Sequence, residues 1–217
     1  MNLSELILND IKPVEMGQKI LLTQQMFNNL TYSHIPVSEE DDFIGCISAN
    51  DAHCFDSESS ILDCKYVIEL FFVIESANWL DVLEAFAQNN TNIMPVMSNN
   101  NYIGYYELKD IISLFDQTPF FYEPGAVLII RKGLKEYSFS EVSQIVESNN
   151  AKILGVFLSK VENLLAEITV KINNHNISEI IQTFIRYGYE VVSGNEEESY
   201  LQDLKDRSDY LKKYLDI

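Results

Sequence analysis

The hydrophobic pattern of the first half of the chain alternates between helical spacing and strand spacing. Four residues that lie three or four positions apart predict a helix near residues 20–30, because such residues share one helical face. These residues are Ile20, Thr23, Phe27 and Leu30. Two short apolar runs follow, IPV at 35–37 and FIGCI at 43–47, with the polar turn SEEDD between them. Both runs predict strands.

The same order of elements recurs 59 residues further along the chain. Residues 20–51 (copy one) align with residues 79–110 (copy two) without a gap, and seven aligned positions are identical. Chance would give roughly two. The identical pairs are Leu21/Leu80, Phe27/Phe86, Pro36/Pro95, Val37/Val96, Ile44/Ile103, Gly45/Gly104 and Asp51/Asp110. Two copies indicate a duplicated small module and not a solenoid.

Two residue types inside these strands constrain the fold. Pro36 and Pro95 favour the first residue of a strand or the edge of a sheet, because proline has no N–H to donate. Gly45 and Gly104 lie within the second strand of each copy. A glycine at such a position indicates close approach by another backbone or by a ligand.

Both copies resemble the cystathionine β-synthase (CBS) domain, and the tandem pair, or Bateman module, would span about residues 1–118. The family's signature is a strand of type h-P-V, a polar turn and then h-h-G-h-h-(S/T)-x-x-D, where h is an apolar residue. Copy one contains IPV, SEEDD and FIGCISAND, which match every position. Copy two contains MPV, SNNN and YIGYYELKD, in which Glu107 replaces the hydroxyl residue.

The resemblance implies clefts between the copies that bind adenosine-type ligands such as AMP. In the family the aspartate accepts the ribose hydroxyls, and the Ser or Thr hydroxyl holds a phosphate. These roles carry over to Asp51 and Ser48 and, less completely, to Asp110. Ile35 and Met94 of the h-P-V strands are further candidate contacts. Ser48 and Asp51 are also good N-cap residues, so simple helix capping is the alternative explanation.

Three features of the first half oppose tight nucleotide binding. Glu107 would repel a phosphate, so we expect the site around it to be empty or to take an uncharged or cationic group. Pro13 and Phe72 stand where the family often has a threonine. Residues 1–118 also contain no arginine that would hold a phosphate.

A different pattern starts after a linker at residues 116–119. The order strand, helix, strand, strand, helix, strand predicts a ferredoxin-like α/β sandwich. The predicted strands are 126–130, 151–158, 163–173 and 189–192, with the middle two meeting near 160–162, and the predicted helices are 139–148 and 177–187. We therefore predict an α/β (α+β) protein with CBS domains at 1–61 and 62–118, a βαββαβ domain at 119–197 and a C-terminal helix at 198–217.

The βαββαβ segment resembles the ACT domain in its size, its topology and its opening GAVLII. The resemblance implies a regulatory domain that senses amino acids at a dimer interface. Arg131, Lys132 and Lys135 follow the first predicted strand, and this positive loop is a candidate site for an amino-acid carboxylate. A solvated loop is the alternative. A Bateman pair followed by an ACT-like domain is also the order in acetoin-utilisation-like proteins.

The last segment carries leucines at spacings of three and four residues. They are Leu201, Leu204, Leu211 and Leu215, with Ser208 in the same register. This stripe is too short for a stable isolated helix and requires a partner surface. We predict a homodimer that buries the stripe across its twofold axis, and folding back onto its own domain is the alternative.

Composition limits the partners and the location. The 217 residues carry 15 Lys and Arg against 33 Asp and Glu, a formal charge of −18, and residues 1–118 carry 18 acids and 4 lysines. Such a charge repels nucleic acid and anionic membranes, so we expect neither as a partner. No run reaches the roughly 18 apolar residues of a membrane span, and the first residues do not resemble a signal peptide. Three cysteines without a CxxC spacing favour a reducing, cytoplasmic location with free, buried thiols.

No pattern of catalytic residues is present in the sequence. It has no nucleophile–base motif, no Gly-rich phosphate loop and no metal-ligand spacing. For His53, Cys54 and Cys64, core packing is a better explanation than a metal site. We therefore expect no catalytic residue, no metal and no cofactor other than an adenosine-type ligand. The leading hypothesis is a regulatory protein that senses a small ligand, and the alternative is a constitutive scaffold with decayed ligand sites.

Overall fold

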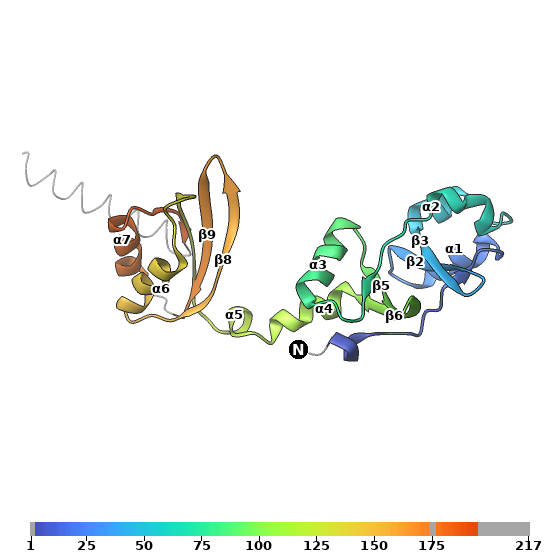
Figure 1. Cartoon of the computed structure of the whole chain (residues 1–217), viewed down its shortest axis with the longest axis horizontal. Coiled ribbons are helices and arrows are strands. Elements are labelled where there is room, and N and C mark those ends of the chain that lie inside the picture. Colours follow the sequence, from blue (N-terminus) through green and yellow to red (C-terminus); the bar gives the residue numbers. More distant parts are fainter. Residues whose placement is uncertain (1–2, 174–176, 195–217) are drawn as a thin grey trace, which may run out of the picture. The chain divides into compact units, whose positions relative to one another are not determined.

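The computed structural model describes residues 3–173 and 177–194, and it divides into two units, Met1–Asp116 and Gln117–Ile217 (Figure 1). Unit 1 contains both copies of the repeat, and unit 2 contains the βαββαβ segment. The helix predicted at 198–217 lies outside the described residues.

Unit 1 contains two three-stranded sheets of the same design, ordered β1-β2-β3 and β4-β5-β6. Copy one provides β1 (Val14–Glu15), α1 (Ile20–Asn29), β2 (His34–Glu39), β3 (Asp42–Ser48) and α2 (Ala49–Cys54). Copy two provides β4 (Val73–Ile74), α3 (Trp79–Gln88), β5 (Ile93–Ser98), β6 (Asn101–Glu107) and α4 (Leu108–Asp116). Short 3-10 helices, η1 (Leu3–Leu6) and η2 (Ile61–Val67), precede β1 and β4. The bounds of all strands and of α1 and α3 repeat with an offset of 59 residues, as the sequence repeat predicts.

The polar turns predicted between the paired strands are tight hairpins. Glu40 and Asp41 have φ angles of 54° and 70°, and Asn99 and Asn100 have φ angles of 49° and 66°. Two successive positive φ angles define the two-residue turn that matches the twist of a hairpin, and Asn and Asp tolerate them best.

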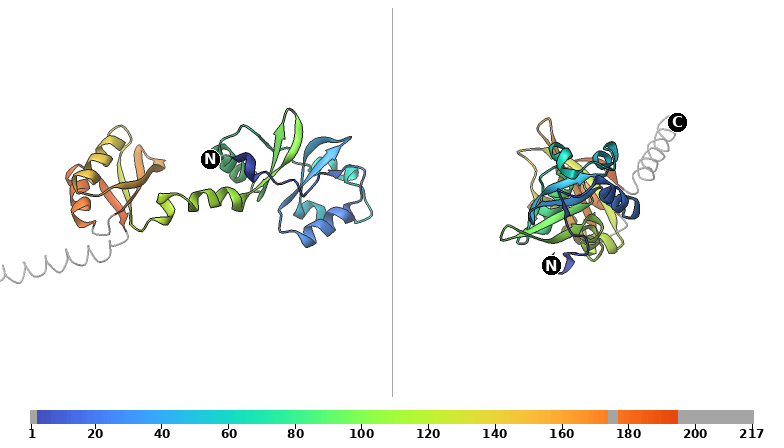
Figure 2. Two further views of the ribbon diagram at one scale, coloured as in Figure 1. Left: turned by 90° about the horizontal axis from the view of Figure 1, so that it is seen from below. Right: turned by 90° about the vertical axis from the view of Figure 1, so that its right-hand side faces the viewer.

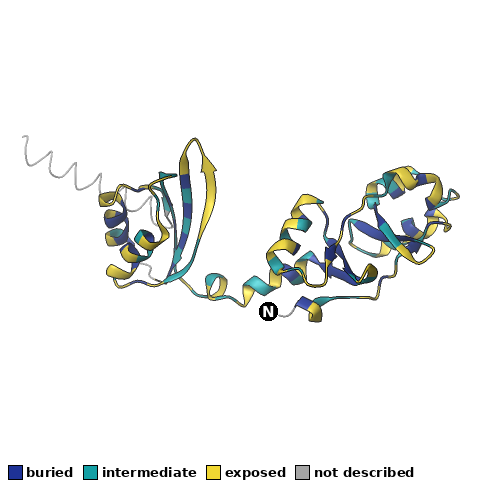
Figure 3. Ribbon diagram, in the orientation of Figure 1, coloured by how far each residue is buried: buried dark blue, intermediate teal, exposed yellow. Residues whose placement is uncertain are grey.

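The first helix of each copy turns its periodic apolar face toward the core (Figure 3). Helix α1 buries Ile20, Thr23 and Phe27, and α3 buries Val82 and Phe86. The helical spacing in the sequence therefore identified the buried face correctly, and Thr23 is a polar residue at a core position.

The two prolines are not where we predicted them. Strands β2 and β5 are the central strands of their sheets, and Pro36 and Pro95 lie inside them. The ladder with the short strand β1 begins only at Val37, one residue after Pro36. Pro36 therefore precedes that ladder and does not interrupt it, which explains how a central strand accommodates a proline.

The two glycines are approached by backbone, which confirms the first of the two alternatives for them. A Cβ built on Gly45 would lie 2.7 Å from the carbonyl oxygen of Glu69, and one on Gly104 would overlap the carbonyl oxygen of Leu8. Both glycines also have positive φ angles, 145° and 150°. No side chain fits at either position without moving the backbone.

The approaching segments exchange between the copies. Leu8 precedes copy one in the sequence but pairs with Tyr105 of copy two, and Glu69 precedes copy two but pairs with Cys46 of copy one. Each copy is therefore completed by the segment that leads into the other.

Residues that the repeat makes equivalent contact each other where the copies meet. The Ser33 N–H donates to Asn92 Oδ1 at 2.8 Å, and the Asn92 N–H donates to Ser33 Oγ at 3.1 Å. The rings of Phe43 and Tyr102 stack at 5.8 Å with an angle of 19°. Since each pair is separated by 59 positions, both pairs lie on the pseudo-twofold axis that relates the copies.

Unit 2 is the predicted ferredoxin-like fold. Its sheet has the order β10-β7-β9-β8, and every neighbouring pair is antiparallel. The elements are β7 (Ala126–Gly133), α6 (Phe139–Ser148), β8 (Ile153–Glu162), β9 (Leu165–Ile172), α7 (Ser178–Arg186) and β10 (Glu190–Gly194). Helices α6 and α7 cover one face of the sheet (Figure 2). The turn between β8 and β9 is at Asn163–Leu164, beyond the predicted position near 160–162.

The predicted linker contains a one-turn helix, α5 (Pro119–Tyr122), that contacts β8. The ring of Phe120 lies so close to Gly155 that a Cβ there would overlap it, and it also contacts the ring of Phe157. Lys171 donates to the carbonyl oxygens of Phe120 and Phe121 in this helix.

Candidate ligand sites

The repeat places two equivalent sites in unit 1. Site 1 comprises Cys46, Ser48 and Asp51 of copy one with Glu69 and Thr91. Site 2 comprises the residues that the 59-residue offset makes equivalent to Cys46, Ser48, Asp51 and Thr91. The exchanged segment that pairs with β6 takes the place of Glu69. Its members are Tyr105, Glu107, Asp110, Leu8 and Tyr32.

Ser48 and Asp51 of site 1 bind each other at the start of α2. Ser48 is the N-cap residue, and its Oγ accepts a hydrogen bond from the Asp51 N–H at 3.0 Å. The same hydroxyl donates to Asp51 Oδ2 at 2.5 Å. The predicted capping role is therefore present. Both side chains are half-buried, so the pair also faces partly outward.

His34 and Glu69 lie beside this pair. His34 is directly opposite Ser48 in the β2–β3 ladder, and its Nε2 lies 4.0 Å from Glu69 Oε1. Burial lowers the pKa of His34, and the nearby carboxylates of Glu69 and Asp51 oppose that shift only in part. The side chain of His34 is only 8% exposed, and it faces the acids of site 1.

Site 2 is filled by larger side chains. Tyr32 Oη of copy one donates to Glu107 Oε1 at 2.5 Å, and it lies 3.2 Å from Tyr105 Oη. Tyr105 in turn donates to Asp10 Oδ1 at 2.6 Å, and Lys109 forms an ion pair with Glu107. Glu107 is 7% exposed and Tyr105 is fully buried, so the centre of the network is buried, whereas Asp10 and Lys109 at its ends are exposed.

The charges of this network are held by its own members. Burial and the bond to Glu107 raise the pKa of Tyr32, and the bond from Tyr105 lowers the pKa of Asp10. Glu107 likewise raises the pKa of Lys109. Tyr32 is therefore neutral, and Asp10 and Lys109 stay charged over a wide pH range.

The remaining candidate residues of unit 1 lie apart from these contacts. Asp110 is in the first turn of α4, three residues beyond Glu107, which ends β6 and binds Tyr32. Ile35 and Met94 are fully buried in the hydrophobic cores of their copies. Their side chains cannot contact a ligand, and only their backbone groups remain candidates.

Two open grooves also lie on unit 1. One of about 500 Å³ passes Thr91 and Ser33, so it adjoins the axis and one member of site 1. Its lining residues are Ser33, Leu83, Phe86, Ala87, Asn90, Thr91, Asn92 and Leu108. The other, of about 550 Å³, is lined mainly by Phe43, residues 70–76 and residues 97–100, and contains none of the predicted site residues.

The predicted cationic cluster of unit 2 does not form. Arg131 and Lys132 belong to β7 and not to the loop after it, so their side chains point to opposite faces of the sheet. Arg131 binds Glu167 at 2.9 Å, and Lys132 binds Glu141 at 2.6 Å and lies over the ring of Tyr189. Lys135 is exposed and lies beyond the end of the strand.

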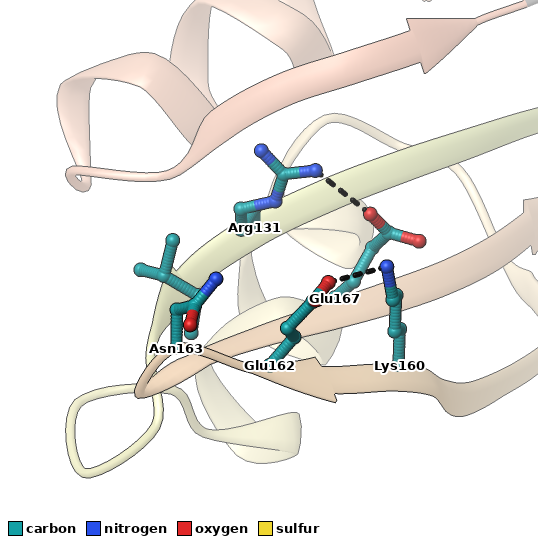
Figure 4. A pocket seen from close by; sticks show the side chains of 6 residues that line it. Arg131, Lys160, Glu162, Asn163 and Glu167 are labelled. Carbon is teal, nitrogen blue, oxygen red and sulfur yellow. Dashed lines mark hydrogen bonds and ion pairs between the residues drawn. The ribbon is translucent and has the colours of Figure 1, made fainter.

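Arg131 instead lines a small pocket at one end of the sheet (Figure 4). The pocket has a volume of about 140 Å³, and its cations and acids pair with each other as Arg131–Glu167 and Lys160–Glu162. Because each cation already has an acidic partner, the pocket presents no net positive charge to a carboxylate.

Within residues 3–173 and 177–194, no group of three His, Cys, Asp or Glu residues could hold a metal ion. Over the same residues no helix is both long enough and apolar enough to cross a bilayer. Cys46 and Cys64 are buried and free as predicted, whereas Cys54 is exposed.

Comparison with known proteins identifies the module. Residues 67–116 match the family model of the CBS domain. No curated protein matches the chain. The match covers copy two, and copy one repeats its element bounds, sheet order and strand register with the 59-residue offset. Copy two is therefore similar to the CBS domain, and copy one has the same strand order and register.

Solved structures similar to the chain include a CBS domain pair/ACT domain protein from Thermotoga maritima. It is 20% identical with a TM-score of 0.48, and the similarity covers 53% of this chain and 96% of that chain. The CBS domains of a transcriptional regulator from Streptococcus pneumoniae are 18% identical with a TM-score of 0.46, covering 52% and 98%. The CBS pair domain of a putative Mg²⁺ transporter from Shewanella oneidensis is 13% identical with a TM-score of 0.47, covering 54% and 70%.

Proposed function

We propose that the protein is a non-catalytic regulatory protein whose CBS-type pair senses an adenosine-type ligand at site 1. The supporting observation is the difference between the two equivalent sites. Site 1 has Thr91, Cys46 and Ser48 at the positions where site 2 has Tyr32, Tyr105 and Glu107. None of the hydrogen bonds described above joins Ser48 or Asp51 of site 1 to a side chain of copy two. We attribute this to the small residues at these three positions.

The chemistry of site 1 favours adenosine or AMP over ATP. Asp51 provides a carboxylate for two ribose hydroxyls, and a carboxylate accepts two donors at once. Glu69 and Asp51 are both acidic, and His34 is held neutral by burial. No cation is therefore available beside Ser48 to hold a phosphate, and additional phosphates should weaken binding.

Calorimetric titration of the full chain with adenosine, AMP and ATP without metal tests this proposal. We expect adenosine and AMP to bind more tightly than ATP. Asp51→Ala should weaken binding by roughly 2–3 kcal/mol, because two ribose hydroxyls lose an acceptor. Asp110→Ala is the matched control and should leave the affinity unchanged. Tighter binding of ATP, or equal effects of the two substitutions, would contradict the proposal.

The alternative function is a constitutive scaffold whose ligand sites have decayed. It is favoured by the mutual hydrogen bonds of Ser48 and Asp51, which satisfy the cap without a ligand. A chain that binds none of the three ligands, with Asp51→Ala lowering only the stability of unit 1, would support the scaffold. An amino-acid ligand for unit 2, a homodimer, an ACT-like role for unit 2 and a cytoplasmic location stay predictions.

A further inference from the structure

We infer that site 2 is a latent second ligand site that the chain plugs with its own Tyr32 and Glu107. This inference rests on the proposed function, because it assigns to site 2 the same class of ligand as to site 1. It explains why a duplicated module with two aspartates at equivalent positions, Asp51 and Asp110, would bind a single ligand.

The plug consists of two of the three positions at which the sites differ, and the third, Tyr105 in place of Cys46, is a buried core residue. Tyr32 is equivalent to Thr91, and Glu107 is equivalent to Ser48. The Thr91 hydroxyl donates to the Ile93 carbonyl of its own copy at 2.8 Å and lies 3.1 Å from Ser33 Oγ, so it is used at the axis and does not bind Ser48. The Tyr32 hydroxyl instead crosses to the other copy and donates to Glu107. The Tyr32 side chain of copy one thus binds Glu107, the residue of copy two that is equivalent to Ser48.

Both carboxylate oxygens of Glu107 already have a partner within the chain. One carboxylate oxygen accepts from Tyr32, and the other forms the ion pair with Lys109. With 7% of the residue exposed, little of the carboxylate remains for a ligand. The sequence predicted that Glu107 would empty this site by repelling phosphate. The structure adds a second and stronger reason, because an uncharged ligand would also have to displace the Tyr32 ring.

The remaining framework of site 2 is intact. Tyr105 is fully buried in a core cluster with Ile11 and Ile93, and its hydroxyl donates to Asp10. Asp110 has the same place in its helix as Asp51. Removal of the Tyr32 ring and the Glu107 carboxylate should therefore leave a site with an aspartate, as in site 1.

The test replaces the two plug residues by their counterparts in site 1 and leaves Tyr105 in place. We expect the full chain with Tyr32→Thr and Glu107→Ser to bind two adenosine molecules in a calorimetric titration, where the unmodified chain binds one. The additional site should be lost when Asp110→Asn is added, and the original site should be lost with Asp51→Asn. A control with Tyr66→Thr and Glu84→Ser removes the same groups from exposed positions and should still bind one adenosine.

The outcomes separate this inference from the proposed function. A folded double variant that gains no Asp110-dependent site overturns the plug, whatever the unmodified chain binds. An unmodified chain that binds no adenosine overturns the proposed function, and a single Asp110-dependent site gained by the variant would still support the plug. If the double variant does not fold, Tyr32→Thr alone removes the ring and should gain a second site about tenfold weaker than the first. The absence of that site would also overturn the inference.

Discussion

The buried hydroxyl of Thr23 provides the sharpest test of how unit 1 is packed. Thr23 lies on the core face of α1, its side chain is completely buried, and its Oγ1 has no hydrogen-bond partner. The equivalent residue of copy two is Val82, which is buried in α3 at the same position. Thr23→Val therefore replaces an unsatisfied hydroxyl by the methyl group that the other copy already uses.

The expected gain follows from the cost of burying an unpaired hydroxyl, which is about 1–3 kcal/mol. Valine and threonine have similar size and are both branched at Cβ, so the change leaves helix propensity nearly unchanged. With a urea m-value of about 1.5 kcal/mol/M, a gain of about 1.5 kcal/mol moves the unfolding midpoint upward by about 1 M. The m-value itself should not change, because the surface exposed on unfolding is the same.

The assay is urea unfolding followed by tryptophan fluorescence. The single tryptophan, Trp79, begins α3, so its emission reports unit 1 and not unit 2. Thr91→Val is the matched control, because the buried Thr91 hydroxyl is satisfied by the N–H and the carbonyl of Ile93. That change should lower stability by about 1–2 kcal/mol. A midpoint that is unchanged or lowered by Thr23→Val would refute the reasoning, as would equal effects of the two changes.

Three further predictions concern the backbone, the pH dependence and the assembly. Gly104→Ala should destabilise unit 1 by about 2–4 kcal/mol, measured by the same unfolding assay, because the new methyl group overlaps the Leu8 carbonyl; a neutral effect would show that the exchanged segment moves freely. Burial lowers the pKa of His34, so the unfolded chain binds more protons below pH about 6.5 and stability should fall as the pH drops through that range. His34→Gln should remove this part of the slope, and an unaltered slope would mean that His34 does not cause it. Truncation after Gly194 should weaken the predicted homodimer in light scattering at micromolar concentration, and a dimer of undiminished stability would exclude the C-terminal segment from the interface.

The candidate site shows the limit of sequence reasoning most clearly. Ser48, Asp51 and Glu107 were found because the CBS signature is a local pattern of a few residues. Tyr32 and His34 lie outside that pattern. Nothing near them in the sequence indicates that Tyr32 binds Glu107 or that His34 faces Glu69. The only available signal was the repeat itself, which aligns Tyr32 with Thr91. Copy one therefore has a large residue at a position where copy two has a small one.

The sequence by itself determined the local elements and the duplication. Helical period, paired turn residues and the 59-residue offset act over short stretches, so they specify α1, the hairpins and a close approach at Gly45, which the structure shows to be by backbone. These features depend on φ/ψ preferences and on which face is apolar, and both are written in neighbouring residues.

Only the tertiary structure decided which distant segments meet. The sequence did not reveal that Leu8 pairs with copy two, that Pro36 is in a central strand, or that Arg131 and Lys132 bind acids on opposite faces of a sheet. Each of these facts depends on strand order and on contacts between residues far apart in the chain. Such contacts are selected by the packing of the whole unit, because many local patterns are compatible with several strand pairings. Only one pairing satisfies the backbone hydrogen bonds and buries the core.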